Sequence, residues 1–199
     1  MRRGAILQPL LRGVAGFVLG FALWAGLTQP YNRLLASSAG GLIRLFEHPD
    51  RTELRAEGKQ VLVYRSDVPP GSTRPGIPAY DLTFNVILLA VLFAVDPHPL
   101  SNRNVGFFAV AIAILIPTHV LALVAWVQDL YASRFGPISE RYSGAERALW
   151  ANGLYFYRLV GQFAIPLILR WSLTPQASLD GRTRGYNSGG RHPARRRKR

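Results

Sequence analysis

The sequence predicts an all-α membrane protein with four transmembrane helices, a small periplasmic β-hairpin and a disordered basic C-terminal tail. The first observation behind this prediction is a set of long apolar stretches, at residues 13–29, 77–95, 105–127 and 148–169. The second is that basic residues gather on one side of these stretches. Because a bilayer-spanning helix needs about 20 mostly apolar residues, the stretches are candidate spans and the charges orient them.

Composition separates this chain from an ordinary soluble domain. Only 18% of its 199 residues are Asp, Glu, Lys or Arg, compared with about 25% in typical soluble domains. The first and third stretches carry no charged residue, the second carries Asp81 and the fourth carries Arg158. A soluble protein with four buried helices is the alternative. The length of the uncharged runs, and the Trp and Tyr residues that flank them, favour a membrane.

The charges place both termini in the cytoplasm. With the N-terminus inside, the inner segments are 1–12, 96–104 and 170–199, and together they hold 13 basic and 2 acidic residues. Their net charge of +11 accounts for most of the chain's +13. Lys and Arg resist translocation and therefore mark cytoplasmic segments. We expect a multi-pass protein of the bacterial inner membrane.

An alternative for the first stretch is a cleaved signal peptide. A basic lead precedes the apolar core, and the small residues 36–39 form a loose cleavage site. Cleavage would leave three spans and a new N-terminus outside. The apolar run continues past Pro30, which favours a retained span.

The first stretch carries Gly16 and Gly20, about one helical turn apart. Small residues at this spacing let another helix approach closely. We expect a packing face within the protein's own bundle, with homodimerisation as the alternative. Pro30 should kink or end the helix. Residues 33–46 then form either a helix on the outer membrane surface or a continuation of the first helix.

An outer segment departs from the helical pattern. Residues 52–66 include a β-rich run at Val61–Tyr64 and a turn around Gly58, which predicts a β-hairpin. A lone hairpin is marginally stable in water, so it should pack on the membrane surface, on the 33–46 helix or on a partner. Repeated Pro and Gly then mark 67–78 as an extended linker.

Three parts follow from these boundaries: a four-helix transmembrane domain over 1–173, a hairpin and linker inserted in it at 47–76, and a disordered basic cytoplasmic tail over 174–199. Gly, Ser and Arg dominate the tail, which has almost no apolar content. We expect the tail to fix topology and to touch anionic lipid. Binding of nucleic acid or of an acidic cytoplasmic partner is disfavoured as an alternative, because no aromatic platform accompanies the charges.

Polar residues within the stretches gather in the outer half of the predicted bundle. At about 1.5 Å of rise per residue, His119 and Arg158 lie about 10 and 15 Å below the outer boundary. The candidate partner-contact cluster consists of Arg158, His119, Asn85, Tyr155 and Gln162. For Arg158 three roles are open: snorkelling or bonding to carbonyls freed by Pro117, gripping a partner's transmembrane segment or an anionic group, and catalysis.

Chemistry beyond packing has few candidate residues. His119 is expected to bond a free backbone carbonyl, and the other histidines lie in separate loops without the spacing of metal ligands. The chain has no cysteine, which excludes disulfides and thiol nucleophiles. No stretch pairs two carboxylates, and no Ser-His-Asp set can be assembled. We therefore expect a protein that is not an enzyme and that holds no cofactor and no metal.

Several short segments carry a family likeness, together with the order of elements: Phe21–Trp24, Pro30–Asn32, Val61–Tyr64, Ile116–His119 and Gln128–Leu130. In these the chain resembles the small membrane proteins that accompany exosortases, in particular the exosortase H-associated membrane protein family. The resemblance implies an inner-membrane accessory to a system that sorts and processes C-terminally anchored surface proteins. Exosortases themselves are multi-pass transpeptidases with a catalytic cysteine, so a chain without cysteine is not that enzyme.

These observations predict a non-catalytic integral membrane accessory or scaffold subunit of an envelope protein-sorting, processing or export complex. Its partners would be other integral membrane proteins, including an exosortase-like transpeptidase. One alternative is a structural subunit of a large energy-transducing complex, photosynthetic or respiratory. A small transporter is a second alternative, disfavoured because the chain has four predicted spans, no repeat and no polar path through the inner half.

Overall fold

The computed structural model describes residues 4–47, 51–67 and 74–174. The predicted tail therefore lies outside the described residues, apart from Thr174. The described chain is mostly helical with one small sheet. Its elements are α1 (Gly4–Arg44), β1 (Thr52–Glu57), β2 (Gln60–Arg65), β3 (Gly76–Ile77), α2 (Tyr80–Thr83), α3 (Asn85–Ala94), α4 (Asn102–Arg134), the 3₁₀-helix η1 (Gly136–Arg141), α5 (Gly144–Phe156), the π-helical turn η2 (Tyr157–Gly161) and α6 (Gln162–Leu173).

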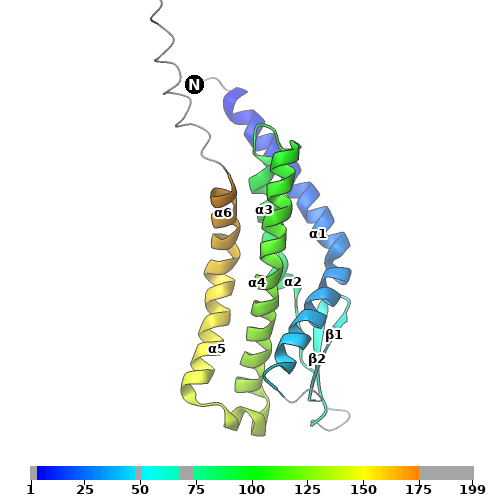
Figure 1. The fold of residues 1–199 in the computed structure, drawn as a ribbon, viewed down its shortest axis with the longest axis vertical. Coiled ribbons are helices and arrows are strands. Elements are labelled where there is room, and N and C mark those ends of the chain that lie inside the picture. Colours follow the sequence, from blue (N-terminus) through cyan, green and yellow to red (C-terminus); the bar gives the residue numbers. More distant parts are fainter. Residues whose placement is uncertain (1–3, 48–50, 68–73, 175–199) are drawn as a thin grey trace, which may run out of the picture.

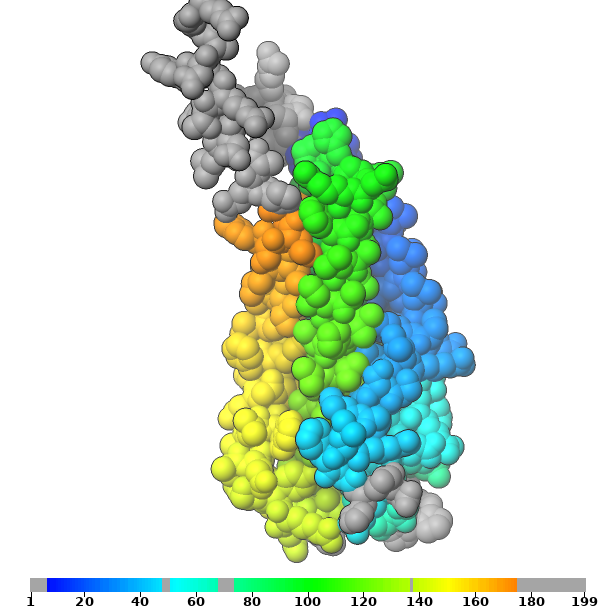
Figure 2. Space-filling view, viewed as in Figure 1, coloured from blue at the N-terminus to red at the C-terminus, as the bar shows by residue number. Residues whose placement is uncertain are grey.

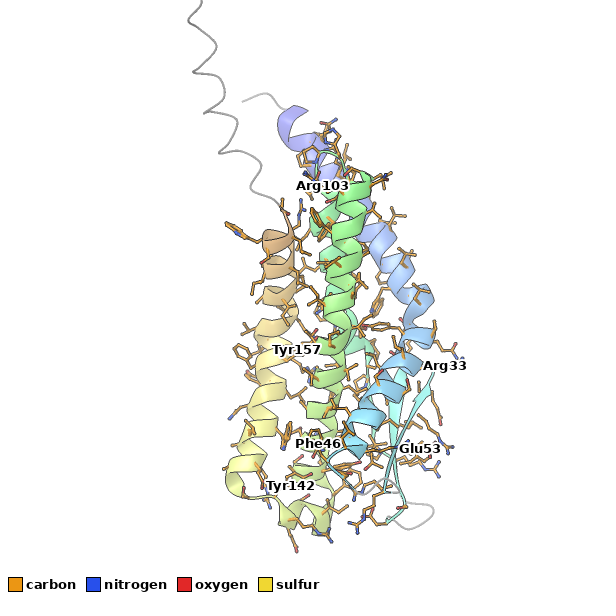
Figure 3. The ribbon with its side chains drawn as sticks, viewed as in Figure 1. Arg33, Phe46, Glu53, Arg103, Tyr142 and Tyr157 are labelled. Carbon is orange, nitrogen blue, oxygen red and sulfur yellow. The ribbon has the colours of Figure 1, made fainter. Side chains whose placement is uncertain are left out.

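The elements form an elongated bundle with two different ends (Figure 1). The start of α1, the loop between α3 and α4 and the end of α6 lie together at one end, which we call the N-terminal end. The sheet, η1 and the start of α5 lie at the opposite end, which we call the sheet end. Arg103 marks the first and Tyr142 the second in Figure 3. On the face shown in Figure 2, α4 lies between α5–α6 and α1.

Helix α1 is a single helix of 41 residues. It bends about midway along its length (Figure 1) but does not end at Pro30. Residues 33–44 continue it, which is the second of the two forms expected for this segment. The reason is tertiary packing, since Leu35, Ala39 and Ile43 are fully buried against the sheet and α4. Burial of this face outweighs the backbone hydrogen bond that a proline inside a helix removes.

Two helices are long and apolar enough to cross a membrane, by length and composition, over Leu7–Arg44 and Asn102–Arg134. The second predicted stretch forms shorter helices, because the helix is interrupted at Phe84, between α2 and α3. The fourth is interrupted by η2 in its middle. The prediction of four spans is therefore supported for two helices only, and these indicate an association with a membrane.

The predicted hairpin is present as β1 and β2, paired antiparallel from Thr52↔Arg65 to Glu57↔Gln60. Gly58 has a φ of 60°, the positive value that the first position of a two-residue hairpin turn requires. The short strand β3 pairs with β2 at Val61↔Ile77. This third strand was not expected, since its residues were assigned to an extended linker.

Two hydrophobic clusters hold the bundle together. The larger lies at the sheet end and joins α1, the sheet, α2 and the second half of α4. The smaller lies nearer the N-terminal end and joins α3, the first half of α4 and α6 around Leu89, Leu115 and Leu169. Gly16 and Gly20 pack α1 against α3 beside the second cluster: an added Cβ at Gly16 would overlap that of Ala94, and at Gly20 it would lie 2.8 Å from Cβ of Ala90.

Candidate functional site: a polar layer across the bundle

A layer of polar groups separates the two hydrophobic clusters, about midway along the bundle. We call it the polar layer, and it consists of Trp24, Tyr31, Asp81, Thr83, Asn85, His119, Tyr157, Arg158 and Gln162. Tyr157 lies at this level, between its own helix and α4 (Figure 3). The layer contains four of the five residues predicted to form a polar cluster. The fifth, Tyr155, has a side chain that is 65% exposed and lies on the bundle surface.

His119 is the centre of the layer and is fully buried. Its Nε2 lies 2.8 Å from Oδ1 of Asn85, and its Nδ1 lies 2.6 Å from the hydroxyl of Tyr31. An amide oxygen only accepts hydrogen bonds, so Nε2 donates to Asn85 and Nδ1 accepts from Tyr31. This places a neutral imidazole between α1 and α3. The expectation of a bond to a free backbone carbonyl was wrong, because side chains from two other helices reach the ring.

The break between α2 and α3 is stabilised by side chains. The end of a helix leaves carbonyl groups without intrahelical donors. Here the carbonyl of Leu82 accepts from the Tyr157 hydroxyl at 3.1 Å, and that of Asp81 accepts from the Gln162 amide. The indole of Trp24 donates to the hydroxyl of Thr83 at 3.1 Å. Irregular backbone at membrane depth is tolerated where protein groups satisfy it in this way.

The π-helical turn aims two of these donors at the break. A π-turn inserts an extra residue into an α-helix and re-aims the side chains that follow. Tyr157 is the first residue of this turn and Gln162 is the first residue after it, and both bond to α2. The turn and the break therefore lie at one level and complement each other.

Arg158 has a specific partner. Its guanidinium lies 3.6 Å from the Asp81 carboxylate and 5.0 Å from the ring centre of Trp126. The expectation that it snorkels outward or bonds carbonyls freed by Pro117 did not include this pair. Its side chain remains 45% exposed. Asp81 is the one charged residue of the second apolar stretch, and Arg158 is the one charged residue of the fourth. Their opposite charges were the sequence signal for this ion pair.

The depths estimated from the sequence did not predict the pairing of Arg158 with Asp81. Asp81 lies near the start of its stretch, whereas the depth estimate placed Arg158 about 15 Å below the outer boundary. The two side chains are at one level because α2 begins in the middle of the bundle, whereas α4 and α5 continue beyond it toward the sheet end (Figure 1). Tyr31 and Tyr157 were not among the residues of the predicted cluster. No periodicity predicts which helices face each other, so their bonds had no signal in the sequence.

A narrow apolar cavity of about 270 Å³ lies on the N-terminal side of the polar layer, between α1, α3 and α4. Its polar groups come from Trp24, Thr28, Tyr31 and Thr83, and aliphatic and Phe side chains form the rest. Among the described residues no group of three or more His, Cys, Asp or Glu side chains could hold a metal ion. The arrangement fixes four helical segments relative to one another and leaves Arg158 partly open at the surface.

A second polar network lies at the sheet end. The Arg65 side chain is 5% exposed, donates two hydrogen bonds of 2.8 Å to Asp67 and lies 4.5 Å over the ring of Tyr131. The Tyr131 hydroxyl meets Thr52, which also donates to Glu47. The hydrogen bond from Arg65 lowers the pKa of Asp67. This network joins β1 and β2 to α4, and no local sequence pattern predicted it.

Comparison with known proteins adds no relative: no family model, no curated protein and no solved structure matches the chain.

Proposed function

We propose that this protein is a four-pass helical membrane protein with both termini in the cytoplasm, acting as a non-catalytic accessory or scaffold subunit of an envelope protein-sorting or processing complex. The observation that carries the proposal is the order of surfaces along the bundle. Uncharged apolar surface lies between the charged N-terminal end and the polar layer, and the charged sheet end follows.

Exposed apolar side chains support the membrane assignment for three of the four passes. They cover three faces: Leu7 to Leu27 on α1, Val105 to Leu121 on α4 and Leu159 to Trp171 on η2 and α6. We call this surface the apolar belt. Between Arg103 and His119 it is about 24 Å tall at about 1.5 Å per residue, close to the hydrocarbon thickness of about 30 Å. The polar layer then lies near the outer edge of the hydrocarbon.

Orientation follows from charge. The N-terminal end carries Arg12, Arg103 and Arg170 against Asp96, and this excess favours the cytoplasm. In this orientation the sheet end lies outside the membrane, and the hairpin is periplasmic. Its third strand and its packing on α1 and α4 supply the support that an isolated hairpin lacks.

The scaffold role rests on how the polar layer is used. His119 has both ring nitrogens occupied, and Tyr157 and Gln162 bond the helix break. These groups stabilise the bundle rather than face a substrate. Arg158 is the most exposed member, with 45% of its side chain open. It lies at the edge of the belt, where a polar group on a partner's transmembrane segment can reach it. The resemblance to exosortase-associated proteins names a candidate partner, an exosortase-like transpeptidase.

The test is recovery of partners from native membranes. The tagged full chain is purified in mild detergent as wild type, Arg158→Leu and Arg33→Leu, the last an exposed α1 arginine outside the polar layer. We expect a stoichiometric membrane partner in the wild type and in Arg33→Leu, and at least tenfold lower recovery in Arg158→Leu, with all three proteins resistant to carbonate extraction. Equal recovery in the three would contradict the proposal. Recovery of a pigment- or haem-bearing assembly would favour the energy-transducing alternative instead.

A further inference from the structure

The N-terminal end of the bundle holds a cavity of about 360 Å³ between the α3–α4 loop, the start of α4 and the end of α6. Arg103 and Arg170 line it from two helices, and His98 and Ser101 line it from the loop. Phe107 forms an apolar part of its wall on the side of the belt. The cavity therefore presents cationic and hydrogen-bonding groups beside an apolar surface.

Asp96 is the single acidic side chain that lines this cavity, and it is already engaged. Its carboxylate accepts from the backbone N–H of His98 and from the Arg170 guanidinium, both at 2.9 Å. Its backbone carbonyl accepts from Arg12 at 3.2 Å. Arg103 forms no ion pair with the described residues. The cavity thus keeps a positive excess with one arginine available.

The neighbouring segments of the sequence also carry a net positive charge. The chain segments that lead into and out of this end, 1–12 and 170–199, hold 12 basic residues and 1 acidic residue. Among the described residues at this end, Arg12, Arg103 and Arg170 outnumber Asp96, so an anion there meets a net positive charge. Arg170 also lies 4.8 Å over the ring of Phe93, so its guanidinium is held at the boundary between charged and apolar surface.

We propose that this cavity binds the phosphate headgroup of an anionic phospholipid of the cytoplasmic leaflet, with the acyl chains running along the apolar belt from Phe107. The inference rests on the proposed membrane embedding and orientation. Basic pockets between helices on the cytoplasmic side of a membrane are suited to anionic headgroups, and each basic residue near the surface contributes about 1 kcal/mol. Arg103 donates to the phosphate, and Arg170 shares its guanidinium between the phosphate and Asp96.

The experiment titrates the full chain, purified in neutral detergent, with short-chain phosphatidylglycerol, phosphatidylcholine or inorganic phosphate, and follows the unfolding temperature. Phosphatidylglycerol should raise the unfolding temperature saturably and phosphatidylcholine should not. Arg103→Gln should weaken the apparent affinity about fivefold, the equivalent of about 1 kcal/mol. Asp96→Asn keeps an acceptor for the His98 N–H and releases Arg170, so it should strengthen the affinity. Arg141→Gln, at the sheet end, is the matched control and should leave it unchanged.

Opposite effects of two substitutions in one cavity separate binding from general destabilisation, since each variant is compared with its own lipid-free value. Equal affinities in Arg103→Gln and Arg141→Gln would overturn the proposal. A second result would also overturn it: replacement of the basic residues 195–199 by glutamine abolishes the stabilisation by phosphatidylglycerol, and Arg103→Gln leaves that stabilisation unchanged. The tail would then be the binding site. An equal shift with inorganic phosphate would identify a site for free anions and overturn the lipid assignment.

The titration needs no protein partner, so its failure leaves the scaffold role standing. Failure of the membrane embedding is recognised separately, by extraction of the protein with carbonate.

Discussion

Tyr157 donates its hydroxyl hydrogen to the carbonyl of Leu82 at 3.1 Å, although the two residues are 75 positions apart in the chain. The bond joins the π-helical turn of one apolar stretch to the break in another. Each irregularity alone would leave backbone groups without partners in an apolar environment. Together they form a single packing unit, which explains why both are present at one level.

Removal of this bond should destabilise the bundle. In Tyr157→Phe the Leu82 carbonyl loses its donor while the ring is kept, and a buried group left without a partner costs about 1–3 kcal/mol. We expect a lower unfolding temperature in detergent, measured by circular dichroism. Tyr155→Phe is the matched control, since Tyr155 is exposed two positions away. Equal unfolding temperatures for the two variants would show that the bond is not stabilising.

The three groups around His119 should behave as one unit. His119→Leu leaves Asn85 and Tyr31 without partners and should lower stability by about 2 kcal/mol or more. Tyr31→Phe should lower the stability of the wild type. In the His119→Leu background it should have almost no effect, because the hydrogen bond from Tyr31 to the ring is already lost. A double-mutant cycle measured by thermal unfolding gives the coupling. Additive effects would contradict the hydrogen bonding of Tyr31 to the ring.

Close contact between α1 and α3 depends on Gly16. Gly16→Ala should displace α1 from α3, since the added methyl meets Ala94, the Ala90 carbonyl oxygen at 3.1 Å and the Val91 Cα at 3.2 Å. Gly26→Ala on the same helix meets no atom within 4 Å and should be neutral or stabilising by up to about 1 kcal/mol, from helix propensity. The comparison is made by unfolding temperature. A loss of stability at Gly26 equal to that at Gly16 would point to the backbone rather than to the contact.

The pairing of Arg65 with Asp67 makes the sheet end sensitive to acid. The hydrogen bond from Arg65 lowers the pKa of the Asp67 carboxyl below its usual value of 3.8. A carboxyl with a lowered folded-state pKa stabilises the fold above its unfolded-state value, and this stabilisation is lost as the pH falls through the folded-state value. Asp67→Asn should therefore unfold at a lower temperature than the wild type at about pH 7, and the difference should shrink below about pH 4.

The control for this pH series is Glu140→Gln on the exposed surface of η1. Its unfolding temperature should equal that of the wild type at every pH. A difference between Asp67→Asn and the wild type that stays constant down to about pH 3 would contradict the role of the carboxylate.

The absence of cysteine allows a direct test of topology. Leu100→Cys places a thiol in the α3–α4 loop, and Glu140→Cys places one in η1, both at exposed positions. With four passes and a cytoplasmic N-terminus, a membrane-impermeant maleimide added to intact spheroplasts should label position 140 and not position 100. If only α1 and α4 crossed the membrane, the labelling would be the reverse. Labelling of both positions from outside would contradict either topology.

Local features of the fold were predictable from the sequence, and contacts between distant segments were not. The hairpin has a local signal, a β-rich run beside Gly58, and the structure confirms it. Strand β3 is two residues long, too short for a periodic pattern. The continuation of α1 past Pro30 is decided by the burial of Leu35 and Ile43, a tertiary effect that outweighs the local preference of proline.

The candidate site shows the same division. The sequence indicates which residues are polar within apolar stretches, and His119, Asn85 and Gln162 all belong to the polar layer. It does not indicate the rotation of each helix, so Tyr155 was included and Tyr31 and Tyr157 were left out. Helical depth arithmetic assumes straight, unbroken helices, and the break at Phe84 and the turn at Tyr157–Gly161 violate that assumption.

The 41-residue helix α1 has a mechanical consequence. At about 1.5 Å per residue it is about 60 Å long, roughly twice the hydrocarbon thickness. Its first half lies along the apolar belt and its second half carries the sheet, and the helix changes direction about midway along its length (Figure 1). A tilt of about 10° within the bilayer would swing the far end of the second half by about 5 Å. In the proposed topology the sheet, which packs on this second half, would move with it as one unit.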